Sequence, residues 1–161
     1  MLITVIYALG LALAFFMAWC LGANDASNPT ECAVGAGVIS MKRAILLFAL
    51  FAAVGGVSLG PFVMKTVDRG IVDRQGLTTQ QLVVGSLVAV ASAIVWVVFS
   101  TWKGMPVSTT HSTIGGVLGC GLAAGGWGLV VWDKFALVLA SILISPLLTM
   151  VLSFGFFHLF R

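Results

Sequence analysis

Long apolar runs separated by short polar stretches dominate the chain. Four of these runs, 2–21, 44–64, 82–102 and 135–160, approach or exceed the ~20 residues that an α-helix needs to cross a bilayer. Two shorter apolar runs, 32–41 and 114–124, each follow a polar cluster. Because a segment inside a bilayer must satisfy its own backbone hydrogen bonds, helices are expected. The pattern predicts an all-α integral membrane protein with about five spans and broken helices at the two polar clusters.

Composition supports a membrane protein. Hydrophobic residues make up 60% of the 161 positions and charged residues only 8%, whereas soluble domains carry roughly 25% charged residues. The length suits a single transmembrane domain, 1–161, surrounded by lipid. The net charge of +3 is small and gives no reason to expect a nucleic-acid partner. The three cysteines have no metal-ligand spacing, so we interpret them as small packing residues.

The first polar cluster, 22–31, reads Gly-Ala-Asn-Asp-Ala-Ser-Asn-Pro-Thr-Glu. Asn24, Asp25 and Asn28 supply oxygen ligands of the kind that hard cations prefer, and the Asp25 carboxylate could hold Na⁺ or a proton. An ionisable group inside a span indicates function, whereas in a surface loop Asp and Asn are ordinary turn residues. Periodicity does not decide whether the cluster interrupts a span at mid-depth or lies at one surface.

A helix start is also predicted within this cluster. Asn28 is a suitable N-cap, Pro29 suits the first helical position, and Glu31 then falls where a capping box needs its acid. We therefore favour a structural role for Glu31 over a role in proton or ion coupling.

The second polar cluster, 104–113, reads Gly-Met-Pro-Val-Ser-Thr-Thr-His-Ser-Thr. If Pro106 begins a helix, free backbone N–H groups and the positive dipole end lie beside the hydroxyls of Ser108, Thr109 and Thr110. This is a donor-rich cradle for a tetrahedral anion without a fixed positive charge. The alternative is that these hydroxyls bond to their own helix backbone. His111 could titrate near neutral pH and take part in coupling, although we favour a packed, hydrogen-bonded residue.

The predicted number of spans suggests that this chain forms only part of a larger transporter. If the first two apolar runs form one broken span, the chain crosses five times and its termini lie on opposite faces. Basic residues do not decide the orientation, because four lie on each side: Lys42, Arg43, Lys103 and Arg161 against Lys65, Arg69, Arg74 and Lys134. A second copy joined at the C-terminus would enter the membrane inverted, as in inverted-repeat transporters. The sequence has no internal repeat, so it looks like one half of such a protein.

The motifs Gly22-Ala23-Asn24-Asp25-x-x-Asn28 and Pro106-Val107-Ser108-Thr109-Thr110-His111, in this order, resemble those of the inorganic phosphate transporter (PiT) family, and the chain is similar to its N-terminal half. The resemblance implies a multi-pass secondary transporter, expected in the cell membrane, that couples phosphate uptake to Na⁺ or H⁺. It also implies a broken first span and an outside N-terminus. By resemblance, phosphate contacts Asp25 and 108–110, while Asn24 and Asn28 shape the site and nearby cations.

The sequence therefore predicts a half-transporter for phosphate that works by alternating access together with a second half or an inverted copy of itself. One alternative is another oxyanion, such as sulfate. A second is a non-transporting membrane subunit or a truncated remnant. An enzyme is the least supported class, because the sequence has no recognisable nucleophile–base pair or metal cluster, and no cofactor is expected beyond the coupling ion.

Overall fold

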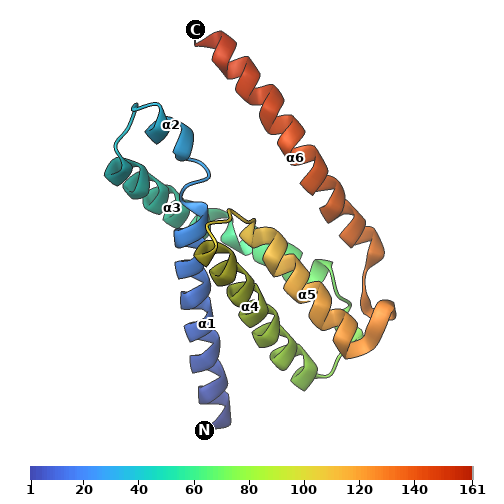
Figure 1. The fold of residues 1–161 in the computed structure, drawn as a ribbon. Coiled ribbons are helices and arrows are strands. Elements are labelled where there is room, and N and C mark those ends of the chain that lie inside the picture. The colour runs from blue at the N-terminus through green and yellow to red at the C-terminus, as the bar shows by residue number, and fades with distance from the viewer. Residues whose placement is uncertain (161) are drawn as a thin grey trace.

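The computed structural model describes residues 1–160, apart from the side chains of residues 66–70. The described chain is all-helical, as predicted. Its elements are α1 (Leu2–Asp25), α2 (Glu31–Gly35), α3 (Met41–Gly70), the short 3₁₀ helix η1 (Arg74–Gly76), α4 (Thr79–Trp102), α5 (Thr109–Gly125), the 3₁₀ helix η2 (Gly126–Leu129) and α6 (Trp132–Leu159) (Figure 1).

Within the described residues, four helices are long and apolar enough to cross a membrane: α1, Met41–Lys65 of α3, α4 and α6. The prediction of about five spans is therefore met only in part. The fifth candidate, α5, has 17 residues and is about 25 Å long, less than the ~30 Å hydrocarbon core. Pro146 lies inside α6, which continues through it. Membrane helices tolerate such prolines when their surroundings satisfy the freed backbone groups.

The first polar cluster does not divide one span into two halves, contrary to our interpretation. α1 runs unbroken for 24 residues, about 36 Å, and ends at Asp25. A series of turns follows, and α2 has only five residues.

The predicted cap of α2 is also wrong. Its N-cap is Thr30 rather than Asn28, and it has no side-chain cap. The Thr30 hydroxyl instead donates to the Ala26 carbonyl (2.7 Å), and the Glu31 amide donates to the Ser27 carbonyl (2.8 Å). These turn bonds delay the helix, so Glu31 is its first residue.

The second polar cluster separates α4 from α5, as expected, but α5 begins later than predicted. Residues 105–108 are non-helical, Ser108 is the N-cap, and Thr109 is the first helical residue. Pro106 thus belongs to the connection. Gly104 allows the turn after α4 because its φ of 70° lies in the left-handed region that favours glycine.

The packed centre consists of α1, α4 and α5. Gly10 lies near Leu87, and Asn24 bonds to Thr101, so α1 and α4 run side by side in the same direction. α5 returns antiparallel to α4. The buried stripe of α4 follows helical spacing and consists of small or slender side chains: Ala89, Ala93, Val97 and Ser100.

At Gly116, α5 lies directly against the backbone of α4. A Cβ atom on Gly116 would lie 2.5 Å from the Ala89 carbonyl oxygen and 3.3 Å from its Cα. The glycine therefore permits direct contact between the two helix backbones, as small residues do in membrane bundles.

The α3–α4 and α5–α6 connections are hydrogen-bonded to each other at the end of the α4–α5 pair that is remote from the polar clusters. Val72 and Val130 form an isolated antiparallel bridge. The Asp73 backbone N–H donates to the Leu129 carbonyl (2.7 Å), and the Val131 backbone N–H donates to the Ile71 carbonyl (3.0 Å). This junction holds the α3–α4 connection against the α5–α6 connection.

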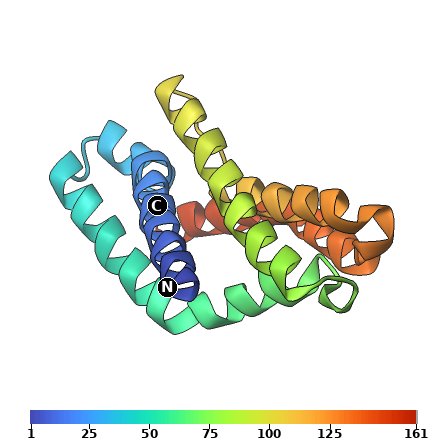
Figure 2. The same cartoon turned by 90° about the horizontal axis from the view of Figure 1, so that it is seen from below.

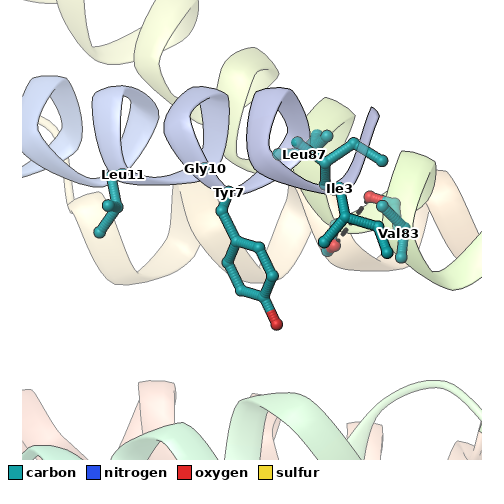
Figure 3. A pocket seen from close by; sticks show the side chains of 8 residues that line it. Ile3, Tyr7, Gly10, Leu11, Val83 and Leu87 are labelled. Atoms are coloured by element: carbon teal, nitrogen blue, oxygen red, sulfur yellow. Dashed lines mark hydrogen bonds between the residues drawn. The ribbon is translucent and has the colours of Figure 1, made fainter. Parts of the chain in front are cut away.

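α3 and α6 pack much less closely. α6 has no buried residue and leads away from η2. The start of α1 and the end of α6 lie at opposite ends of the molecule (Figure 1), and the view along that direction shows the start of α3 at the side of α1 remote from α5 (Figure 2). An open apolar groove of about 550 Å³ also remains between the first half of α1 and the start of α4. There Tyr7 extends from α1 into open space, while the Ser86 hydroxyl donates to the Val83 carbonyl (2.9 Å) (Figure 3).

Candidate functional site

The two polar clusters meet in the folded chain. The C-terminal end of α1 lies against the α4–α5 connection and the first turn of α5, through side chains that are 77 to 84 residues apart in sequence. The family resemblance implied this meeting, because it placed Asp25 and residues 108–110 around one phosphate. Two neighbouring residues, Asn24 and Asp25, make the contacts.

Asn24 holds the connection in place. It is buried, with 6% of its surface exposed. Its amide nitrogen donates to the Thr101 hydroxyl (2.9 Å) and to the Met105 carbonyl (3.3 Å). Its amide oxygen accepts from the Val107 backbone N–H (3.1 Å). Both N–H donors and one oxygen lone pair are thus engaged, which fits the expected site-shaping role and leaves little capacity for an ion.

Asp25 meets the start of α5. The Thr109 hydroxyl donates to Oδ2 of Asp25 (2.7 Å), and Thr109 is only 5% exposed. The other carboxylate oxygen, Oδ1, is buried and has no hydrogen-bond partner among the described residues. Leaving a buried charged acceptor unsatisfied costs more than the ~1–3 kcal/mol of a neutral group. Such an atom marks a place where a ligand can bind.

The first turn of α5 offers donors beside this carboxylate. Ser108, at the N-cap, has extended backbone, and its Oγ accepts from the His111 amide (3.3 Å). The Ser108 hydroxyl hydrogen remains available, as do the first backbone N–H groups of the helix. The positive end of the helix dipole lies at the same place.

Apart from Thr110, the hydroxyl residues of this cluster form two groups. Ser112 and Thr113 donate to the carbonyls of Ser108 and Thr109 (both 2.9 Å), which is the bonding to the helix backbone that we considered as the alternative. Thr109 bonds across to another helix and Ser108 caps α5, so neither follows that alternative.

The remaining candidates are exposed. Asn28 is connected to Asp25 only through its backbone, since its N–H donates to the Asp25 carbonyl (3.2 Å). Thr110 follows Thr109 in the first turn of α5 and is exposed. Glu31 and His111 are also exposed, so the packed position that we favoured for His111 is wrong. Within residues 1–160 neither side chain bonds to Asp25 or Thr109.

Sequence reasoning missed three partners of Asn24. Two of them, the Met105 carbonyl and the Val107 amide, are backbone groups without a sequence signal. Thr101 had a weak signal, as a hydroxyl at the end of an apolar run. Within the described chain, no three His, Cys, Asp or Glu residues come together as a metal site. A cation here would therefore rely on Asp25 with hydroxyl and carbonyl oxygens.

Comparison with known proteins identifies the family of the chain. A sequence model described as "Phosphate transporter family" matches residues 21–161. A Pyrococcus horikoshii protein named "Putative phosphate permease" is 41% identical over 95% of this chain and 38% of its own length. A Pyrococcus furiosus protein of the same name is 39% identical over 98% of this chain and 39% of its own length.

A solved structure, "The sodium-dependent phosphate transporter", superposes with a TM-score of 0.90 at 37% identity. The match covers 96% of this chain and 39% of the solved one. The chain thus spans slightly less than two fifths of the length of these relatives, consistent with a half. The expected resemblance is confirmed: this multi-pass membrane chain belongs to the phosphate transporter family, whose members are transporters and not enzymes.

Proposed function

We propose that this chain forms one half of a Na⁺-coupled phosphate transporter, with Asp25 and the first turn of α5 as part of its ion site. The observation that carries the proposal is the buried, unpartnered Oδ1 of Asp25 beside the donor-rich start of α5. The family and the name of the similar solved transporter support both phosphate and sodium.

The arrangement brings a carboxylate close to an anion-binding helix start. Two like unit charges about 4 Å apart repel by about 4 kcal/mol at an effective dielectric constant of 20. A cation on Oδ1 would remove this repulsion, so phosphate would bind well only when the cation is also bound. That is the physical requirement for symport. The cation is Na⁺ in our proposal because the similar transporter is named sodium-dependent.

Each residue then has a distinct role. Asp25 holds the cation through Oδ1, while Thr109 orients its carboxylate. Ser108, Thr110 and the free N–H groups of the first turn donate to phosphate oxygens. Asn24 positions the connection, and Asn28 contributes to the rim of the site. Glu31 and His111 lie outside this set.

A complementary half would supply the remaining walls of the site. We use this term for the portion of the transporter beyond the region matched here, whether it belongs to the same or another polypeptide. The chain covers 39% of the solved transporter, and α6 buries no side chain against the rest of the chain. Alternating access would follow from one half rocking against the other around the shared site.

The test is phosphate uptake into vesicles that contain this chain and its complementary half, under a Na⁺ gradient or a K⁺ gradient. Uptake should require Na⁺ and fall at least tenfold in Asp25→Asn. Asp133→Asn, the same change at an exposed position in the first turn of α6, is the matched control and should transport normally.

Uptake that is unchanged in Asp25→Asn would contradict the site. Sulfate that competes as well as unlabelled phosphate would favour the other-oxyanion alternative. If no anion is taken up while the two halves still associate, the chain would be a non-transporting subunit.

A further inference from the structure

A large cavity lies between α1, α3, α4 and α5, with a volume of about 990 Å³. At one end its lining includes Lys65, Arg74 and Gln81, which lie near the junction of the two connections. At the other end it includes Leu21 of α1 and Thr113 of α5. The cavity and the α1–α4 groove of Figure 3 share Ser86 as a lining residue and otherwise have different walls.

The inner end of this cavity approaches the candidate ion site from two walls. Leu21 precedes Asp25 by four residues on α1, and Thr113 follows Thr109 by four residues on α5. Residues four apart lie one turn apart on the same face of a helix. The cavity therefore stops about one helical turn short of the hydrogen bond between Asp25 and Thr109.

One face of α5 forms a continuous wall from the site to the outer end. Its cavity-lining residues recur at intervals of three or four: Thr113, Val117, Cys120 with the adjacent Gly121, and Ala124. Thr109 continues the same face by one more turn. From Thr113 to Ala124 the wall is about 17 Å long.

We infer that this four-helix cavity is an aqueous vestibule through which a small oxyanion reaches the Asp25–Thr109 pair from the end of the molecule that carries Lys65. The inference rests on the proposed function for the identity of the anion. At ~30 Å³ per molecule of liquid water, the volume has room for about 30 waters, enough for a hydrated anion. The exposed Lys65 ammonium raises the local concentration of anions at the entrance. Among the described residues that line the cavity none is acidic, and because the walls are largely apolar, few groups would trap an anion.

Cys120 is a native probe of this wall. In a Cys20→Ala/Cys32→Ala background it is the sole thiol of this chain, and the complementary half would be made cysteine-free. We would measure its modification by the membrane-impermeant anion sulfonatoethyl methanethiosulfonate, in vesicles with this chain and its complementary half. The thiolate attacks the reagent sulfur, forms a mixed disulfide and releases methanesulfinate. Cys120 should react from one side of the membrane only.

Two neighbouring positions supply the controls, each in a background that also carries Cys120→Ser. Val117→Cys lies on the cavity wall, whereas Leu118→Cys lies on a different face of α5. Val117→Cys should react at least tenfold faster than Leu118→Cys. The anionic label on Cys120 should also slow phosphate uptake more than the cationic ethylammonium reagent does, because it places a negative charge in the path.

Reaction with membrane-permeant N-ethylmaleimide would show that Cys120 and Val117→Cys carry reactive thiols. If these two positions then react no faster than Leu118→Cys with the anionic reagent, lipid or packed protein fills the cavity and the inference is overturned. Labelling does not depend on uptake. Fast one-sided labelling without phosphate uptake would therefore support the vestibule while contradicting the proposed function.

Discussion

Asn24 and Asp25 are adjacent, yet their side chains do different work. The side-chain amide of Asn24 is hydrogen-bonded to Thr101 and to the α4–α5 connection, whereas Oδ1 of Asp25 has no hydrogen-bond partner among the described residues. Their polarity in an apolar chain made both stand out as candidate site residues. The different hydrogen-bonding roles of these two side chains were not predictable, because two of the three Asn24 partners are backbone groups whose position depends on the fold.

Replacing Asn24 by Ala should destabilise the fold rather than only alter ion binding. The change leaves the buried Val107 N–H and Met105 carbonyl without these bonds, at a cost of ~1–3 kcal/mol. For a chain of this size that corresponds to a fall in the melting temperature of roughly 3–10 °C, measurable by tryptophan fluorescence in detergent. Asn28→Ala, at an exposed position, should change it little. Equal shifts in the two variants would refute the joint role of Asn24.

Thr109→Val should impair Na⁺-dependent uptake with little change in shape. Valine has nearly the volume of threonine but removes the hydroxyl that orients Asp25 Oδ2. We expect at least a tenfold loss of uptake and recovery in Thr109→Ser, which restores the donor. Thr149→Val makes the same change on exposed α6, where the hydroxyl only bonds to Ser145, and should have no effect. Normal transport by Thr109→Val would exclude the hydroxyl from the site.

At the scale of the elements, hydropathy predicted the long helices well but not the helix starts. Length and apolar character determine which segments can cross a bilayer. A helix start depends instead on which residue keeps an extended backbone and finds local hydrogen bonds. Ser108 takes that position instead of Pro106, and the turn bonds of Thr30 displace Asn28.

The contact between α4 and α5 leads to a prediction at a single glycine. Gly116→Ala would place a methyl group against the Ala89 backbone, and neither helix axis can yield without disturbing the buried α4 stripe. We expect a lower melting temperature and a smaller monodisperse fraction in size-exclusion chromatography. Gly119→Ala, with nothing within 4 Å, should be neutral or slightly stabilising because alanine favours helix. If both variants behave alike, the close approach of α4 and α5 is not important for stability.

At the scale of the whole molecule, α3 and α6 show why the arrangement of helices could not be predicted. Their apolar faces suit lipid and another protein equally, so hydropathy carries no information on what covers them. The open arrangement is nevertheless that of a larger transporter, since 96% of the chain superposes on 39% of a solved one with a TM-score of 0.90. The exposed apolar faces of α3 and α6 are therefore expected to be covered by lipid or by another part of a transporter.

The last prediction concerns linkage between the two ions in the assembled transporter. If Na⁺ on Asp25 removes the repulsion of phosphate, Na⁺ must tighten phosphate binding, and phosphate must tighten Na⁺ binding by the same factor. A coupling of 1–3 kcal/mol corresponds to a factor of about 5 to 150, within reach of isothermal calorimetry. In Asp25→Asn the neutral amide neither repels phosphate nor holds the cation strongly, so phosphate affinity should become nearly independent of Na⁺. Phosphate affinity that responds to pH but not to Na⁺ in the unmodified protein would instead assign the coupling to a proton on Asp25.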